Sequence, residues 1–335
     1  MRVTKAFFGF AALSLAAVAA AAQDSAPPAE PQAEPAPTPP AEAPPERGLS
    51  GLESTVSELR DEPAPAAETP TPPAATPPPP SPPAVAPTPP SQPLTAEQRA
   101  QLTAATQRGR LLFTIARAGL IATQDMLSRV SDPAGAGIVG WVAEPEGNAT
   151  SVTFYANGAG APPAAVYRVG ILGGRATSRE VFLAGNRPPL GPHLARMAAA
   201  RAATDALDHP ACGESLNVLV VPPAAANAPI DVYQMSAPSQ RGQYPAGGHY
   251  KSTIAPDGSV AASRGFTNAC LALDVPQPVA GQQPRPLAIT HLLDPLPTEI
   301  HVFLALATGH PLAVVAGDPQ RLFAVTGEGI AEVPR

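Results

Sequence analysis

Lysine, cysteine and aromatic residues are all scarce in this sequence of 335 residues. The only lysines are Lys5 and Lys251, there are two cysteines, and aromatic residues make up 4% of the chain. Residues 94–335 contain seventeen acidic and seventeen basic residues and only one lysine. A near-neutral, Lys-poor domain is a poor nucleic-acid binder, because phosphate neutralisation needs a basic face, so we set nucleic acid aside as a partner. The core must be built mainly from Ala, Val, Leu and Ile.

A complete catalytic motif is also lacking. The run GGHYKS at 247–252 places a histidine, a lysine and a serine within four residues. On a strand, however, Lys251 and Ser252 point to opposite faces, whereas a serine–lysine hydrolase needs both on one side. The sequence therefore favours a non-enzymatic protein over an enzyme.

Residues 1–22 have the pattern of a Sec-type bacterial signal peptide. Arg2 and Lys5 provide a positive start, an apolar run follows, and small alanines precede Gln23. The alternative is a retained membrane anchor, for which the apolar run is short and rich in alanine. We expect cleavage, a periplasmic or secreted protein, and no membrane span in the mature chain.

Residues 23–93 form a low-complexity segment of Pro, Ala, Glu and Thr. It contains ten acidic residues and two arginines, whereas residues 94–335 contain seventeen of each sign. Such a composition cannot bury a hydrophobic core and predicts a disordered, acidic tether with polyproline II character. The net negative charge of the chain therefore comes from the tether.

One patch of this tether is more apolar than its surroundings. Leu49, Leu52, Val56 and Leu59 recur at helical spacing, with acidic and hydroxyl residues between them. A lone helix of this length is marginal in water. The patch is therefore either a segment that folds on a partner, such as an envelope protein or cell-wall component, or a weakly helical stretch without a role.

The remainder of the chain predicts an α+β fold. Thr95 and Gln98 have capping-box spacing and begin a long helix at 96–129. Short β-branched or aromatic runs separated by turn residues then predict an antiparallel meander. The expected strands are 138–143, 151–156, 164–172 and 178–183. A Pro-rich break at 187–192 divides this part, residues 94–190, from a C-terminal α+β part, residues 191–335, although the two may form one unit.

The C-terminal part predicts a mixture of strands and helices. Asp257-Gly258 is a hairpin turn, and Thr298 caps a helix at 299–308 that Gly309 and Pro311 end. A further helix is expected at 193–207. The expected strands are 216–221, 230–235, 248–254, 259–263, 270–273, 287–291, 312–315, 321–325 and 330–333.

The two cysteines, Cys212 and Cys270, have two interpretations. In an exported protein an even pair indicates a disulfide, which would stabilise the chain by about 4 kcal/mol in the chain-entropy model. The alternative is a catalytic cysteine paired with a histidine, but neither cysteine has a recognisable nucleophile context. The disulfide is favoured.

The most distinctive cluster of polar residues lies between residues 287 and 316. His291, Asp294, Glu299 and His301 fall within eleven residues, which suffices for a metal site if the loop folds back. The candidate ligands are His291, Asp294 and His301, with zinc as the metal. The alternative is a polar rim around an ordinary core helix, and this simpler interpretation is preferred.

The same segment resembles the zinc-binding part of JAB/MPN (JAMM) metallopeptidases. That family has His-x-His-Pro followed by Ser-x-x-Asp, within the order strand, His, Pro-containing loop, helix and apolar strand. His291 matches the first histidine, but Leu293, Asp294, Thr298 and His301 replace the second histidine, the proline, the serine and the aspartate. The resemblance implies a degenerate, inactive relative used for binding.

Together these observations predict an exported, envelope-associated binding or assembly module on a tether, without a cofactor. The alternative is a JAMM-like, metal-dependent hydrolase that uses His291, Asp294 and His301, with His249 as a further candidate residue.

Overall fold

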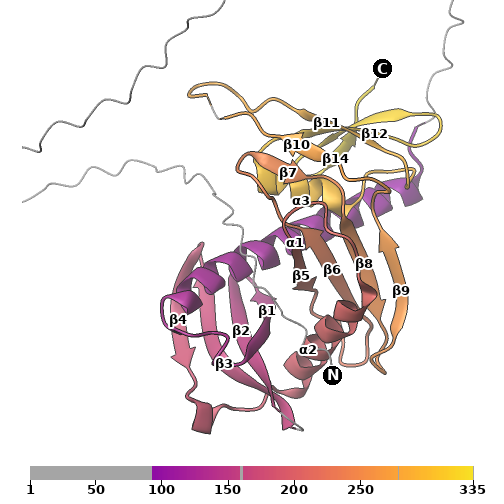
Figure 1. Ribbon diagram of the computed structural model, residues 1–335. Helices are drawn as coiled ribbons and strands as arrows, with labels where there is room; N and C mark the ends of the chain where they lie inside the picture. The colour runs from indigo at the N-terminus through magenta and orange to yellow at the C-terminus, as the bar shows by residue number, and fades with distance from the viewer. Residues whose placement is uncertain (1–92, 159–160, 278, 335) are drawn as a thin grey trace, which may run out of the picture. The chain divides into compact units, whose positions relative to one another are not determined.

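A computed structural model describes residues 93–158, 161–277 and 279–334. The predicted signal peptide, all of the predicted tether except Pro93, and the apolar patch with Leu49, Leu52, Val56 and Leu59 lie outside these residues. The fold is α+β with several antiparallel sheets, as the sequence predicted (Figure 1).

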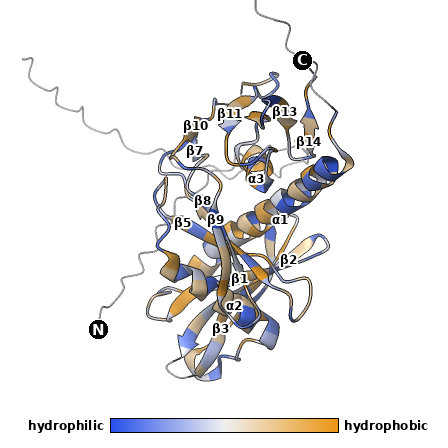
Figure 2. Cartoon of the chain, turned by 90° about the vertical axis from the view of Figure 1, so that its right-hand side faces the viewer, coloured by the Kyte–Doolittle hydropathy of each residue, from blue (hydrophilic) through white to orange (hydrophobic). Residues whose placement is uncertain are grey.

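The first described element is a long helix, α1 (Ala96–Leu127). Its N-terminus is the predicted capping box: the Gln98 backbone N–H donates to the Thr95 hydroxyl at 3.1 Å, and the Gln98 side chain accepts from the Thr95 N–H at 2.9 Å. The helix ends two residues before the predicted end, with Ser128 as the C-cap. Figure 2 shows that its first half is more hydrophilic than its second half.

Four antiparallel strands follow in the order β1-β2-β3-β4, which confirms the predicted meander. Their bounds are Ile138–Glu146, Ala149–Gly158, Ala161–Leu172 and Arg175–Val181. The prediction placed the last strand at 178–183, which is wrong by several residues. Gly173 and Gly174 both have positive φ, so they make the turn, and pairing with β3 resumes at Arg175.

A second antiparallel sheet has the order β5-β6-β8-β9, with bounds Leu216–Val220, Ile230–Ser236, His249–Ile254 and Val260–Gly265. Both of its faces are covered along β5 and β6. Alternate residues such as Val218 and Val232 pack with α2 (Pro192–Thr204), while Leu219, Tyr233 and Met235 belong to the core around α1. The short 3-10 helices η1 (Ala184–Asn186) and η2 (Asp205–Leu207) flank α2.

The C-terminal elements form a third sheet in the order β11-β12-β13-β14. Its strands are Leu287–His291, Leu312–Ala316, Arg321–Val325 and Ile330–Glu332. The helix α3 (Glu299–Thr308), whose bounds match the prediction, connects the parallel pair β11 and β12. A small ladder pairs β10 (Ala272–Asp274) with β7 (Gln243–Pro245), a strand that the sequence did not predict.

The helix α1 joins these elements into a shared core. It contacts α3, the strands β1 to β4, and β5, and one buried cluster contains residues of all three larger sheets. Residues on both sides of the predicted boundary at 190 belong to this cluster, such as Val169 and Val314. The division into 94–190 and 191–335 stays a prediction.

Candidate functional site

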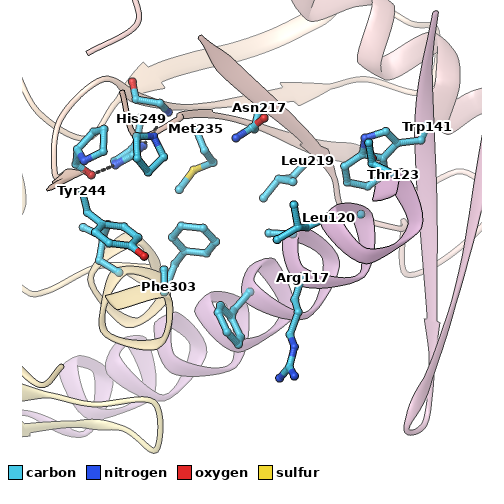
Figure 3. Close-up of a pocket in the computed structure, with 18 residues that line it drawn as sticks. Arg117, Leu120, Thr123, Trp141, Asn217, Leu219, Met235, Tyr244, His249 and Phe303 are labelled. Atoms are coloured by element: carbon cyan, nitrogen blue, oxygen red, sulfur yellow. Dashed lines mark hydrogen bonds between the residues drawn. The ribbon is translucent and has the colours of Figure 1, made fainter. Parts of the chain in front are cut away.

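An apolar cavity of about 110 Å³ lies beside the second half of α1. Side chains from α1, α3, β1, β5 and β6 line it, together with the loop and strand before β8 (Figure 3). The chain has one tryptophan, five tyrosines and nine phenylalanines. Four of these scarce side chains line the cavity: Phe113, Trp141, Tyr244 and Phe303.

The two helices approach through aromatic and glycine contacts. Phe113 of α1 and Phe303 of α3 meet edge to face, with 6.5 Å between ring centroids, an arrangement that aromatic pairs favour. Gly119 lets the Trp141 ring lie directly against α1, because a Cβ at this position would be 2.5 Å from that ring. The walls of the cavity are thus formed by residues from distant segments of the chain: α1, β1 and α3.

His249 and Ser236 provide the polar end of the cavity, and their groups are satisfied internally. The Ser236 backbone N–H donates to His249 Nδ1 at 3.2 Å, so Nε2 carries the proton and donates to the Pro245 carbonyl at 2.9 Å. Burial disfavours the imidazolium and lowers the pKa of His249 to about 4. The ring is therefore neutral at pH 7.

Arg117 differs from these groups because it is exposed and uncompensated. It extends from α1 away from the other labelled side chains (Figure 3), and its guanidinium lies near the turn at Gly174. Among the described residues, Arg117 makes no ion pair. The site therefore combines an apolar interior with one unneutralised cation at its edge.

The Cys212–Cys270 disulfide predicted from the sequence is confirmed, with the Cα atoms 5.2 Å apart. It adjoins the polar end of the cavity: a Cβ on Gly248 would lie 2.7 Å from Cys212 Sγ, and Gly248 has positive φ. The Cys212 N–H also donates to the Ser236 hydroxyl at 2.8 Å. The bridge fastens the segment that carries His249, and it leaves no free thiol for a cysteine nucleophile.

The predicted metal ligands do lie close together. His291, at the end of β11, donates from Nε2 to Asp294 at 2.8 Å, and its ring is 4.7 Å from the ring of His301 on α3. The Thr298 N–H donates to His301 Nδ1 at 3.0 Å, because His301 is the third residue of the α3 capping box. Burial, and then the neighbouring His291, lower the pKa of His301 to about 3.

A fourth side chain, which the sequence did not bring to this cluster, is Arg264 from β9. It donates to both oxygens of Asp294 at 2.9 and 2.6 Å. Burial raises the pKa of Asp294, but the hydrogen bonds from His291 and Arg264 outweigh it and lower the pKa. Both oxygens of Asp294 and Nδ1 of His301 thus already have protein partners.

A metal ion at Asp294 would therefore have to replace the hydrogen bonds from Arg264 and His291. In the part of the chain that the structure describes, no group of three or more His, Cys, Asp and Glu side chains is placed to hold a metal ion. The zinc site at His291, Asp294 and His301 and the JAMM resemblance stay predictions.

The structure also assembles a polar network that the sequence did not predict. His209 donates from Nδ1 to Gln234 Oε1 at 2.7 Å, since the Gln234 Nε2 donates to the Thr204 carbonyl. Its ring stacks on Tyr250, and its Nε2 lies 3.3 Å from the Ser263 hydroxyl as an acceptor. The order Ser, His, Gln is that of a nucleophile, a base and an orienting group. None of these four residues lines the cavity or the larger cleft described below.

A larger cleft of about 660 Å³ borders the first half of α1. Its lining includes Arg108, Asp231, Lys251 and Glu299, with three prolines among the remaining residues. Asp231 pairs with Lys251 at 3.1 Å and with Arg108 at 3.4 Å. The Tyr233 hydroxyl donates to Glu299 at 2.8 Å.

Comparison with known proteins adds little. No protein-family model matches the sequence, and no curated protein matches it. Among solved structures, the chain is similar to the Bacillus megaterium YpeB C-terminal domain, with 11% identity and a TM-score of 0.19, over 44% of this chain and 64% of that one. The likeness spans less than two thirds of that chain, and at this TM-score it carries no argument.

Proposed function

We propose that the chain is an exported, non-enzymatic binding module of a bacterial envelope, and that its cavity receives an apolar group of a protein or cell-wall partner. The observation that carries this proposal is the cavity: a chain poor in aromatic residues gathers Phe113, Trp141, Tyr244 and Phe303 around one space. Ligand sites are concave and mostly apolar, with a few placed polar groups.

The size and charge of the cavity define the ligand. A volume of about 110 Å³ is somewhat below that of a cavity that binds benzene, about 150 Å³. It therefore accommodates one aliphatic or small aromatic group. Arg117 favours a ligand with a carboxylate or another anion beside the apolar group, because a free guanidinium pairs well with carboxylates.

Export is supported by two observations. The N-terminal 22 residues have signal-peptide composition, and the disulfide is typical of an oxidising compartment. As a separate finding, no helix within the described residues is long and apolar enough to cross a bilayer.

A second candidate function is metal-dependent hydrolysis of the JAMM type. It is supported by the close approach of His291, Asp294 and His301, which the sequence predicted. It requires Arg264 to release Asp294. Metal analysis after purification tests this candidate: stoichiometric zinc that disappears in His291→Ala would favour the hydrolase over the binding module.

The cavity is tested with benzoate, an aromatic anion with a single ring, by following the fluorescence of Trp141, which lines the cavity. We expect saturable binding at one site, because the probe combines an apolar body with a charge for Arg117. Ala116→Leu fills the cavity from α1 and should weaken binding about tenfold or more, since each buried carbon of the probe that it displaces costs about 0.8 kcal/mol.

Two matched variants serve as controls. Ala105→Leu makes the same change on α1 but borders the cleft instead, so it should leave probe binding unchanged. Arg117→Gln should weaken binding, whereas Arg175→Gln, at another exposed arginine, should not. Absence of saturable binding, or equal affinity in Ala116→Leu and the parent chain, would refute the proposal.

A further inference from the structure

The hydrogen bonds of the network around His209 all run in one direction. The Gln234 Nε2 donates to the Thr204 carbonyl at 3.4 Å, so its Oε1 accepts the Nδ1 proton of His209 at 2.7 Å. Nε2 of the neutral ring then accepts from the Ser263 hydroxyl at 3.3 Å. Since a hydroxyl has one proton to give, Ser252 donates to Ser263 Oγ at 3.0 Å. The Ser263 proton is therefore directed at an unprotonated imidazole nitrogen.

The His209 ring is fixed both in position and in tautomer. Its Nδ1 partner, Gln234, lies on the central strand β6 and is buried. The ring stacks on Tyr250 of β8, with 4.2 Å between ring centroids and 13° between the planes. The Tyr250 hydroxyl also donates to the carbonyl of the next residue, Pro210, at 2.9 Å. The nitrogen that faces Ser263 is thus held as a proton acceptor.

Ser263 itself is accessible from outside the protein. It is exposed, and β9 is the last strand of its sheet among the described residues (Figure 1). The Phe266 N–H donates to the His249 carbonyl at 3.0 Å, so these two residues form a hydrogen-bonded pair. Such pairs alternate with non-bonded pairs, which makes Ser252 and Ser263 a non-bonded pair. The Ser263 N–H therefore points to the open edge of β9, where it is a donor beside the hydroxyl.

We propose that Ser263 is an acyl-acceptor site, whose hydroxyl takes an acyl group from an activated carboxylic ester with His209 as the base. Oγ attacks the carbonyl carbon of the ester while its proton passes to His209 Nε2. The bond from this carbon to the ester oxygen then breaks, and the same proton leaves with the alcohol. Ser263 becomes an ester and His209 is neutral again. Gln234 is a positioning residue, because it holds only the Nδ1 proton.

The arrangement also indicates which acyl donor can react. An amide at Gln234 brings no negative charge to stabilise the imidazolium, unlike the aspartate of a Ser-His-Asp triad, so the ester needs a good leaving group. Neither the cavity nor the cleft borders Ser263, so we expect a small acyl group. The proposal goes beyond the binding function and does not depend on it, because the chain itself is modified at a place apart from the cavity.

The test is incubation of the full chain with 4-nitrophenyl acetate, an activated ester of a small acid. We expect one acetyl group per chain, which peptide mass mapping places on Ser263, with release of an equal amount of nitrophenolate. Ser263→Ala should abolish this acetylation. His209→Gln should slow it about a hundredfold or more, since this is what a positioned general base contributes. Urea unfolding verifies that both variants are folded.

Three further variants are matched controls or test the positioning residue. Ser259→Ala, at another exposed serine on the hairpin turn before β9, should leave the acetylation of Ser263 unchanged. Tyr250→Phe keeps the ring that stacks on His209 and should also leave it unchanged. Gln234→Leu removes the acceptor of the Nδ1 proton and should slow the reaction, whereas Gln234→Glu keeps an acceptor and should retain it.

Three outcomes would overturn the proposal. Acetylation that maps to other residues would do so, as would acetylation of Ser263 at the same rate in His209→Gln. Unchanged release of nitrophenolate from Ser263→Ala would mean that another group reacts with the ester. None of these outcomes bears on the cavity, whose role as a binding site is decided separately by the binding of benzoate.

Discussion

The two openings along α1 differ in how their charges are satisfied. In the cleft beside the first half of the helix, Asp231 is within 3.4 Å of Arg108 and within 3.1 Å of Lys251. In the cavity beside the second half, His249 is neutral and hydrogen-bonded, and Arg117 has no ion-pair partner among the described residues. The cavity, the smaller of the two openings, is therefore the one whose charged group, Arg117, is available to pair with a ligand.

This difference shows that volume alone does not identify a site. A ligand entering the cleft would have to compete with ion pairs that the protein already makes, and such exchanges of charge partners gain little in water. A ligand entering the cavity removes apolar surface from water and meets a free guanidinium, and both changes favour binding.

The largest expected effect concerns two buried, neutral histidines, of which His249 lines the cavity and His301 lies on α3 beside His291. Burial lowers the pKa of His249 to about 4 and that of His301 to about 3, from an ordinary value near 6.5. The unfolded chain therefore takes up protons first. The free energy of unfolding should be maximal above about pH 6.5 and decrease toward pH 4 by about 1.4 kcal/mol per pH unit for each histidine. Urea unfolding between pH 4.5 and 7 measures this slope.

One variant and one control test whether the buried histidines cause this pH dependence of the free energy of unfolding. In His301→Gln, the amide oxygen replaces the acceptor for the Thr298 N–H and the titration is lost, so the slope should fall by about half. His193→Gln, at an exposed histidine on α2, should leave it unchanged. Because the pKa of Asp294 is lowered from 3.8, the contribution of this carboxylate to the free energy of unfolding changes with pH only below 3.8, outside the measured window. A stability that does not vary between pH 6.5 and 4.5 would contradict the buried, neutral assignment.

The second effect compares the two glycines at which α1 meets its neighbours. A Cβ at Gly109 would lie 2.6 Å from the Glu299 carbonyl oxygen and from Val302 Cβ, and backbone cannot easily move. We expect Gly109→Ala to reduce the free energy of unfolding by about 1–2 kcal/mol, because overpacking outweighs the gain in helix propensity.

At Gly119 the obstacle is the far end of the Trp141 side chain, 2.5 Å from a Cβ. This ring can shift, so Gly119→Ala should change stability by less than Gly109→Ala and instead alter the Trp141 emission. Thermal unfolding and fluorescence spectra of both variants test this. A larger loss of stability in Gly119→Ala would show that the cavity wall is the more rigid of the two regions.

Local signals predicted most of the secondary structure. The bounds of α3 follow from Thr298 at its start and Gly309 in the left-handed conformation at its end, and both act within one turn of the helix. β7 was missed because its three residues contain Pro245 and pair with the equally short β10. Its residues pair with partners 27 to 31 positions away, which no local pattern indicates.

The candidate site could not be predicted, because its parts meet only in three dimensions. Phe113, Trp141, Met235 and Phe303 come from four elements, and each is an ordinary apolar residue in its own segment. The sequence did bring His291, Asp294 and His301 together, since they are near neighbours along the chain. It could not indicate Arg264, which reaches Asp294 from another sheet and changes what that carboxylate can do.

The smallest expected effect concerns the ion pairs of the cleft. Asp231→Asn removes the partner of Arg108 and Lys251 while the Thr253 hydroxyl keeps an acceptor at this position. Since all three charged side chains are partly exposed, we expect a loss of about 0.5–1 kcal/mol that shrinks at high salt. Denaturant unfolding at low and high salt measures it, and Asp257→Asn on the exposed hairpin turn is the control for a change of net charge. The same variant should bind benzoate with unchanged affinity, because Asp231 does not line the cavity. A change in probe affinity would mean that α1 couples the two openings. The cleft, with its paired charges, and the cavity, with its unpaired Arg117, would then be parts of one site rather than two separate sites.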